Sequence, residues 1–414
     1  MKTSVHLLSM VLLSYTGLAA MNCSSEVADD GEHNCVPPIS ITVAIDESLQ
    51  PYAASLPGIN GGPDRRLGAV SDENDTLSSF VTDEVVLSFD SDEELDAFLE
   101  DTGGEVLAQI DPAENGLPDL AQMALIRVDT DGVDTSSLAD DIASSAQADG
   151  EGGDAALRFS SEASARLMAL AMGKRKVGLA VGVNFVAPFQ AIPDSTEEAP
   201  NTTTPQDDHW DAYGWDGWSL DGALGIGVPE AWSLLHYAGK TNNKVKIAII
   251  DGGFSPNEDF PTWTSVGVYG GSGLNQENPN DCTGGSSCPW HGMGVASTAM
   301  ALPDNQFGWA GTGGPVATGV FIQTGGGAAT ANLALIKAGN RNPKIINMSL
   351  AGKVNWSLRA SLSYFENTTE RLRDRGILIF ACSGNNGEDV DTSTCLGDYC
   401  WEDRFYFPCE NTGV

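Results

Sequence analysis

Four short, continuous apolar segments in the C-terminal half of the chain limit the fold most strongly. They are KVKIAII (244–250), GVFIQT (319–324), KIINMSL (344–350) and ILIFACS (377–383). Strands that are buried on both faces have such uninterrupted runs, whereas strands with one solvated face alternate between apolar and polar residues. Helical patterns separate the segments, at 292–302, 330–341 and 357–376. We therefore predict an α/β fold with a parallel sheet, right-handed crossovers and helices on both faces.

Polar residues stand at or beside the ends of three of these segments. Asp251 ends the first, Ser349 lies near the end of the third, and Asn385 follows the last. In parallel α/β sheets, functional side chains collect just beyond the carboxyl ends of the strands. The three residues are therefore candidates for one site, although an aspartate that caps the next turn gives the same pattern as Asp251.

His291 begins a run of small residues, HGMGVAS, that suits the start of a closely packed helix. A helix N-terminus disfavours an imidazolium ion. A proton-accepting histidine there gains from a carboxylate that stabilises its charged form and fixes its tautomer. Asp251 can supply that carboxylate. The alternative is a hydrogen-bonded histidine of the core.

Asn385 lies in SGNNG, where an apolar segment breaks into a glycine-rich turn. An amide side chain presented on such a turn is a donor that can stabilise an oxyanion. The alternative is an ordinary Asn-Gly turn.

The N-terminal half has a different pattern. From Glu84, strand and helix patterns alternate loosely, and we predict a small α+β unit over 84–192. Residues 21–83 are polar, with scattered proline, glycine and aspartate, which predicts a leader or linker. Residues 193–212 are rich in proline, threonine and acids, so we expect an exposed, cleavable linker before a second domain at 213–414.

The first residues predict export. Lys2 precedes an apolar stretch and small residues at Gly17, Ala19 and Ala20, as in a secretory signal peptide over 1–20. A lipid anchor at Cys23 is the alternative to simple cleavage, although Asn22 fits poorly before such a cysteine. No later segment is apolar for the about 20 residues that a membrane span needs. We expect a secreted or cell-surface protein.

The charge excludes some partners. With 57 Asp and Glu against 21 Lys and Arg, the formal net charge is −36. A chain so acidic repels nucleic acids and anionic membranes, and we expect neither as a partner.

Eight cysteines fit an exported protein, in which disulfides persist. Cys282 and Cys288, and Cys395 and Cys400, are spaced to staple surface loops, while Cys409 has no obvious mate and Cys382 lies in an apolar segment. No CxxC pattern supports zinc. Residues 388–398 are rich in oxygen ligands, but their spacing matches no calcium loop, so we expect a solvated loop, with a calcium site as the alternative that the sequence leaves open, and we predict no other metal or cofactor.

Taken together, these motifs resemble those of the subtilisin-like serine proteases, the subtilases, in which Asp, His, Asn and Ser follow in this order. The resemblance covers about 220–414. It rests on GIGVPEAW (225–232), IAIIDGG (247–253), HGMGVAS (291–297), INMSLAG (346–352) and SGNNG (383–387). Residues 84–190 are loosely similar to the inhibitory prodomains of secreted subtilases.

The resemblance implies a role for each matched residue. His291 would be the general base, Asp251 would orient it, and Asn385 would stabilise the oxyanion. The backbone of Ser349, Leu350, Ala351 and Gly352 would pair with a peptide substrate as an added strand. Gly252 and Ala351 depart from the residues that are usual at their positions in the family.

One family motif is missing, the Gly-Thr-Ser-Met-Ala segment that carries the nucleophile. Only 29 residues (414 − 385) follow Asn385, and the motif is not among them. Ser297 and Ser383 belong to the His and Asn motifs and are not expected to replace it. We therefore expect a chain truncated within its catalytic domain, with little or no hydrolytic activity of its own.

Three functions remain from the sequence. The first is the precursor of a secreted serine endopeptidase, with a polypeptide substrate and its own prodomain as partners. The second is a secreted, non-catalytic peptide-binding pseudoprotease. The third is an unrelated hydrolase or Rossmann-like enzyme that uses Asp251, which the absence of a phosphate-binding glycine motif after the first strand disfavours.

Overall fold

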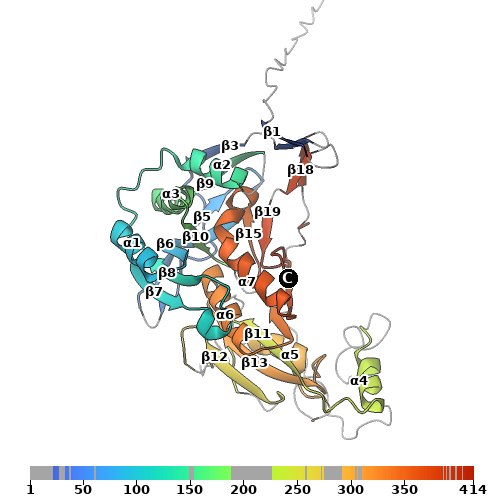
Figure 1. Ribbon diagram of the computed structural model, residues 1–414. Coiled ribbons are helices and arrows are strands. Elements are labelled where there is room, and N and C mark those ends of the chain that lie inside the picture. The colour runs from blue at the N-terminus through green and yellow to red at the C-terminus, as the bar shows by residue number, and fades with distance from the viewer. Residues whose placement is uncertain are drawn as a thin grey trace, which may run out of the picture.

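The structure of the chain is a computed structural model. It describes residues 22–27, 33–36, 39–59, 62–148, 153–187, 226–256, 259–271, 273–274, 291–303, 305, 310–385, 387, 389–390, 393–396, 399–402 and 404–414. The signal peptide expected at 1–20 and the linker expected at 193–212 lie outside these residues. In the described residues the chain forms an N-terminal α+β unit and a C-terminal unit with a parallel sheet (Figure 1). No helix among them is long and apolar enough to span a membrane.

The N-terminal unit is built on an eight-stranded sheet. Its order is β3-β9-β5-β6-β8-β7, with β10 beside β6 and β4 beside β5. The strands are β3 (Ser40–Ile45), β4 (Ser55–Leu56), β5 (Arg65–Ser71), β6 (Leu77–Phe89), β7 (Glu105–Ile110), β8 (Gln122–Arg127), β9 (Asp154–Phe159) and β10 (Ala180–Phe185). The helices are α1 (Asp92–Thr102), α2 (Leu138–Ala148), α3 (Glu162–Lys176) and the short 3-10 helix η2 (Ala113–Asn115). A separate hairpin, β1 (Asn22–Val27) with β2 (His33–Val36), precedes the sheet.

The folded part of this unit begins earlier than the sequence indicated. The prediction of a leader or linker over 21–83 is wrong for β3, β5 and the start of β6, which are paired strands of the sheet. For β5 and β6 the reason is that these strands bury polar side chains, namely Arg65, Ser71, Ser78 and Ser79. Polar residues at core positions remove the alternation by which a half-buried strand is recognised.

The C-terminal unit has the predicted parallel sheet, in the order β12-β13-β11-β14-β16. Its strands are β11 (Val245–Asp251), β12 (Trp263–Gly267), β13 (Ala317–Gln323), β14 (Ile345–Met348) and β16 (Leu378–Ala381). The helices are α4 (Val228–Tyr237), α5 (His291–Met300), α6 (Ala328–Asn340), η4 (Trp356–Leu362) and α7 (Ser363–Asp374). Two antiparallel pairs complete the unit: β15 (Gly352–Asn355) with β19 (Arg404–Phe407), and β17 (Ser393–Leu396) with β18 (Tyr399–Glu402).

Both faces of the parallel sheet are covered, as predicted. Ile247 and Ile249 of β11 belong to the apolar cluster that contains Met293 and Met300 of α5. Ala248 and Ile250, which point to the opposite face, belong to the cluster that contains the apolar residues of α6. Because β11 is buried on both faces from Ile247 onward, its sequence from Ile247 to Ile250 is a continuous apolar run.

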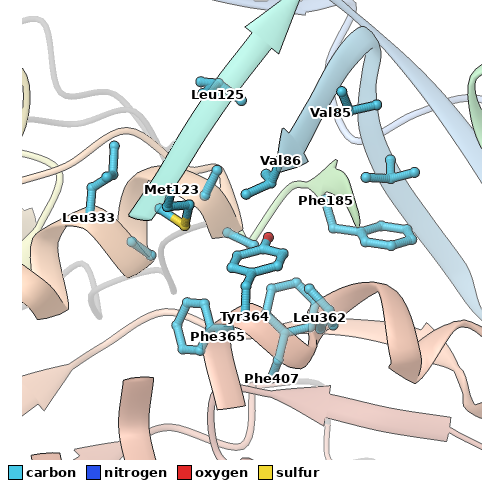
Figure 2. Close-up of a cluster of buried hydrophobic side chains, with 14 of the residues drawn as sticks. Val85, Val86, Met123, Leu125, Phe185, Leu333, Leu362, Tyr364, Phe365 and Phe407 are labelled. Carbon is cyan, nitrogen blue, oxygen red and sulfur yellow. The ribbon is translucent and has the colours of Figure 1, made fainter. Parts of the chain in front are cut away.

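The two units share one hydrophobic core. A single cluster of buried residues joins β6, β8 and β10 to α6, η4, α7 and β19. Figure 2 shows this junction, in which Tyr364, Phe365 and Phe407 face residues of the N-terminal sheet such as Val86 and Phe185. The contact is close, since a Cβ atom at Gly182 of β10 would lie 2.0 Å from the carbonyl oxygen of Ser361. The N-terminal unit therefore packs on the other unit as part of its core.

A buried polar network lies at the same junction. Glu84 is fully buried, and its Oε2 atom accepts hydrogen bonds from Arg65 Nη1 at 3.1 Å and from Asn184 Nδ2 at 2.7 Å. Asn184 Oδ1 in turn accepts the backbone N–H of Ala329, at the start of α6 (3.3 Å). Within the described part of the chain, Glu84 Oε1 has no hydrogen-bond partner. Burial raises the pKa of Glu84, and the Arg65 guanidinium and the Asn184 amide oppose this rise.

The raised pKa of Glu84 predicts a pH dependence of stability. The folded chain holds the Glu84 proton more tightly than the unfolded chain, so the Glu84 contribution to the unfolding free energy falls as the pH rises through the ordinary and then the raised pKa. The native chain should lose stability relative to Glu84→Gln as the pH rises above the ordinary range of a glutamate, and the loss should level off once the pH is above the raised pKa. Urea unfolding of both proteins over these pH values measures the difference.

The control for this experiment is Glu100→Gln, a substitution of an exposed residue of α1. Its unfolding free energy should follow that of the native chain at every pH. A constant difference between the native chain and Glu84→Gln would contradict the assignment of the raised pKa to Glu84.

Candidate active site

Asp251 is the last residue of β11, at the carboxyl end of the central strand of the parallel sheet. Its side chain is fully buried. Its backbone carbonyl accepts the N–H of Thr324 at 2.8 Å, and its Oδ1 atom accepts the N–H of Gly252 at 2.7 Å. These bonds fix the carboxylate in place at the strand end.

His291 is the first residue of α5, and its side chain is 6% exposed. Its Nδ1 atom lies 2.8 Å from Oδ1 and 2.9 Å from Oδ2 of Asp251. A carboxylate only accepts hydrogen bonds, so Nδ1 carries a proton and donates it to Asp251. Nε2, the other ring nitrogen, is then left in the form that accepts a proton. The sequence prediction that Asp251 and His291 meet agrees with this geometry.

The pKa of Asp251 depends on its burial and on its hydrogen-bond partners. Burial raises the pKa of Asp251, while the hydrogen bond and charge of His291 and the Gly252 amide act in the opposite direction. A carboxylate that has lost its water is stabilised most by a cation beside it. The hydrogen bond between the two side chains therefore orients the His291 ring and offsets part of the cost of burying the Asp251 carboxylate.

A glycine permits this contact. A Cβ atom at Gly292 would lie 2.3 Å from the carbonyl oxygen of Gly253 and 3.1 Å from Cβ of Asp251. Real Cβ atoms do not approach a backbone oxygen so closely, so only glycine lets the start of α5 lie against the end of β11. Gly292 thereby sets the distance between the two elements that carry Asp251 and His291.

The predicted substrate-binding residues follow β14, the neighbour of β11. The Oγ atom of Ser349 accepts a hydrogen bond from Asn347 at 3.0 Å, and the side chains of Leu350 and Ala351 are buried. Gly352 is the first residue of β15 and pairs with Phe407 of β19. Ser349, Leu350 and Ala351 thus border the Asp251 strand, while Gly352 is already part of another strand pair. Their role in binding a substrate stays a prediction.

Asn385 lies on the turn after β16, and its side chain is exposed. Gly384, just before it, has a φ of 95°, which glycine adopts readily. Burial raises the pKa of the Cys382 thiol, at the start of this turn, and the Asp251 carboxylate adds to that rise. The turn that carries Asn385 therefore begins within electrostatic range of the buried pair.

The sequence analysis missed a second segment beside Asp251, Gly325–Gly327. It follows β13, the other neighbour of β11, and ends where α6 begins. Gly327 forms an antiparallel bridge with Val186, and the N–H of Ala187 donates to the carbonyl of Gly326 at 2.6 Å. The feature of the sequence that could have indicated this segment is the run of three consecutive glycines between a buried strand and a helix. Their backbone is paired with the residues that leave the N-terminal sheet.

In the described residues, no group of three or more His, Cys, Asp or Glu side chains is placed to hold a metal ion. The oxygen-rich segment 388–398, which was considered above for calcium, lies only partly within the described residues.

The sequence of this chain is similar to known proteins. A sequence model described as the subtilase family matches residues 242–399. A subtilisin from Bacillus pumilus is 30% identical over 163 residues, which are 39% of this chain and 54% of that protein. An alkaline protease from Shouchella clausii is 28% identical over 202 residues, 48% of this chain and 44% of that protein.

Among solved structures, fervidolysin from Fervidobacterium pennivorans, a keratinolytic enzyme related to subtilisin, matches 82% of this chain and 43% of its own. The identity is 12% and the TM-score 0.38. The similarity to the subtilase family therefore rests on the sequence matches and not on this structure. The chain spans about half, or less, of the length of these relatives.

The close approach of α5 to β11 can be tested by Gly292→Ala. The added methyl group overlaps the Gly253 carbonyl, so α5 must move away from β11 and the bond between His291 and Asp251 should break. We expect a loss of about 1–3 kcal/mol of unfolding free energy, typical of overpacking. Proton NMR of nitrogen-15-labelled histidine should show that the hydrogen-bonded Nδ1–H signal of His291 disappears.

Asp251→Asn is the matched control. It should change the same Nδ1–H signal without moving the helix, because asparagine has nearly the volume of aspartate. If Gly292→Ala keeps both the signal and the native stability, the contact between α5 and β11 is looser than the structure indicates.

Proposed function

We propose that this chain, which belongs to the subtilase family through residues 242–399, is the precursor of a secreted serine endopeptidase. Subtilases are serine endopeptidases that act on polypeptides, and they are typically secreted. The observation that carries the proposal is the buried hydrogen bond between His291 Nδ1 and Asp251 at the carboxyl end of the sheet. A lipid anchor at Cys23 has no support from the fold or from the relatives.

His291 and Asp251 would act in catalysis as two members of a Ser-His-Asp triad. His291 Nε2 takes the proton of the serine hydroxyl as the hydroxyl oxygen attacks the peptide carbonyl, and later returns it to the leaving amine. Asp251 keeps Nδ1 protonated and stabilises the imidazolium ion between the two steps. The buried position of Asp251 strengthens this interaction because little water screens it.

In this proposal, none of the serines within residues 1–414 is the nucleophile of the triad. Ser297 lies six residues after His291 on α5, about 9 Å further along the helix axis, too far to donate to His291 Nε2. Ser383 belongs to the turn that presents Asn385. The 414-residue chain alone is therefore expected to form no acyl-enzyme.

Asn385 would supply the side-chain donor of the oxyanion hole, from the exposed turn after β16. Such a donor contributes roughly 3 kcal/mol to transition-state stabilisation in subtilisin. The segment Ser349–Gly352 would pair with the substrate backbone on one side of Asp251. Gly325–Gly327 borders Asp251 on the other side, so an extended peptide between the two segments would pass the catalytic pair.

The N-terminal unit would serve as the prodomain. It shares the core of α6 and α7, and its last described residues, Val186 and Ala187, pair with Gly326 and Gly327 as an added strand. That pairing occupies one of the two proposed peptide-binding segments. Cleavage of the linker at 193–212 would be the step that allows the unit to leave.

The proposal is tested by reading the gene beyond codon 414. We expect the open frame to continue into a Gly-Thr-Ser-like motif, and the extended protein to hydrolyse peptides after release of the N-terminal unit. Asp251→Ala should then lower kcat by about 10⁴-fold and His291→Ala by about 10⁶-fold, the magnitudes known for subtilisin. Asn385→Ala should lower it by about 10²–10³-fold.

A non-catalytic peptide-binding protein is the second candidate, because Gly327 forms an antiparallel bridge with Val186 and the Gly326 carbonyl accepts the N–H of Ala187. A stop codon after residue 414, together with peptide binding by the folded chain and no labelling by a fluorophosphonate probe, would replace the first candidate with the second.

The pairing of the proposed prodomain can be tested by Ala187→Pro, which removes the N–H group that donates to Gly326. A hydrogen bond of this kind contributes about 0.5–1.5 kcal/mol, so amide exchange near Gly326–Gly327 should become about 2- to 10-fold faster. Hydrogen exchange with mass spectrometry of the full chain measures it. Ala187→Ser keeps the N–H and should exchange like the native chain; equal rates in all three proteins would show that the bond does not protect this segment.

A further inference from the structure

Two cysteines that the mechanism does not use, Cys382 and Cys409, are free thiols, each partly buried. Cys382 directly follows β16, and Cys409 follows β19 by two residues. The sequence analysis found no mate for Cys409 and treated Cys382 as a core residue. Their positions in the fold connect them.

The strand register brings both cysteines to the same short segment, residues 349–351. Met348 of β14 pairs with Ala381 of β16, so residue 349 and Cys382 are the next positions along adjacent strands. Gly352 of β15 pairs with Phe407 of β19, so Cys409 lies just past the point where residues 349–351 enter β15. Residues 349–351 are thus bordered by Cys382 on one side and by Cys409 at their far end.

The electrostatics of the thiols agree with this placement. Burial, Glu410 and the Cys382 thiol together raise the pKa of Cys409 to about 11. Burial and a nearby carboxylate, Glu410 for Cys409 and Asp251 for Cys382, disfavour the thiolate, so we expect oxidation of the two thiols to be slow at neutral pH and faster as the pH rises.

Four of the other six cysteines lie opposite one another in the backbone register of two hairpins. The backbone register places Cys23 opposite Cys35 in the β1–β2 hairpin and Cys395 opposite Cys400 in the β17–β18 hairpin. Cys282 and Cys288, which the sequence predicts as a loop staple, lie outside the described residues. With eight cysteines in the chain, Cys382 and Cys409 are the two that these pairs leave.

We propose that Cys382 and Cys409 form a redox pair, which a disulfide-bearing oxidant such as oxidised glutathione converts into a disulfide beside the candidate active site. One cysteine loses its proton, attacks the oxidant and releases one glutathione thiol, which leaves a mixed disulfide. The second cysteine loses its proton, attacks the protein sulfur of the mixed disulfide and releases the second glutathione thiol. Two protein thiols are oxidised and one glutathione disulfide is reduced.

The disulfide would connect the end of β19 to the carboxyl end of β16 across residues 349–351. It would hold the C-terminal segment 404–414 against the edge that is proposed to pair with a substrate. Its relevance to catalysis rests on the proposed function, but its formation does not. Mapping the thiols therefore gives a result even if the chain proves to have no role in proteolysis.

The test is peptide mapping of the full chain after equilibration with oxidised and reduced glutathione. Free thiols are first blocked with iodoacetamide in denaturant, and the unreduced protein is then cut with trypsin and Glu-C. Cuts after Arg375, Glu388, Arg404 and Glu410 separate Cys382 from Cys395 and Cys400. We expect peptide 376–388 to be linked to peptide 405–410.

Two results would overturn the proposal. One is alkylation of both Cys382 and Cys409 after oxidation, and the other is a link from either of them to a different cysteine. The control variant Cys395→Ser/Cys400→Ser should retain the link between the two peptides, because the β17–β18 pair is independent of it.

Stability gives a second readout. Under oxidising conditions the double variant Cys382→Ser/Cys409→Ser should melt on the order of 5 °C below the native chain, because the disulfide constrains the unfolded chain between the two positions. With a reductant present the two proteins should melt together. A difference that persists in the reductant would mean that the serines disturb packing and that no disulfide contributes.

Discussion

The burial of helix α6 on nearly all its sides is the constraint on which the rest of the structure depends. Eleven of its 13 residues are buried, because the parallel sheet covers one side and the N-terminal unit covers the other. A helix that is apolar all round is stable only between two such layers. Since α6 begins directly after Gly325–Gly327, the same packing fixes the backbone beside Asp251. The N-terminal unit thus supports the geometry of the candidate site from the far side of the helix.

The site itself depends on a small separation between two elements. The strand end that carries Asp251 and the helix start that carries His291 come together because Gly292 has no side chain. Burial of Asp251 disfavours its negative charge, and the nearby imidazole offsets this. The two residues therefore need one another in the folded chain: the carboxylate orients the ring, and the ring compensates the buried charge.

The parallel sheet and the Asp251–His291 pair were predictable because both depend on local patterns. Continuous apolar runs mark strands that are buried on both faces, and the strand ends mark the candidate site. The start of the N-terminal sheet was not predictable, because Arg65, Ser78 and Ser79 are buried polar residues that break its apolar pattern. Gly325–Gly327 was missed because glycines leave no side-chain pattern and their partner, Val186, is far away in the sequence. Strand β12 and the placement of Cys382 and Cys409 beside residues 349–351 likewise depend on tertiary pairing.

The strand pairing between Val186–Ala187 and Gly326–Gly327 has a kinetic consequence. Because both segments belong to one chain, their association is unimolecular, and its strength depends on an effective concentration that does not change with the protein concentration. Breaking the chain between them would leave all their contacts intact but make the association depend on the real protein concentration. The fragments would then separate on dilution even though no contact had changed, so a single cut would convert a permanent intramolecular contact into a dissociable complex.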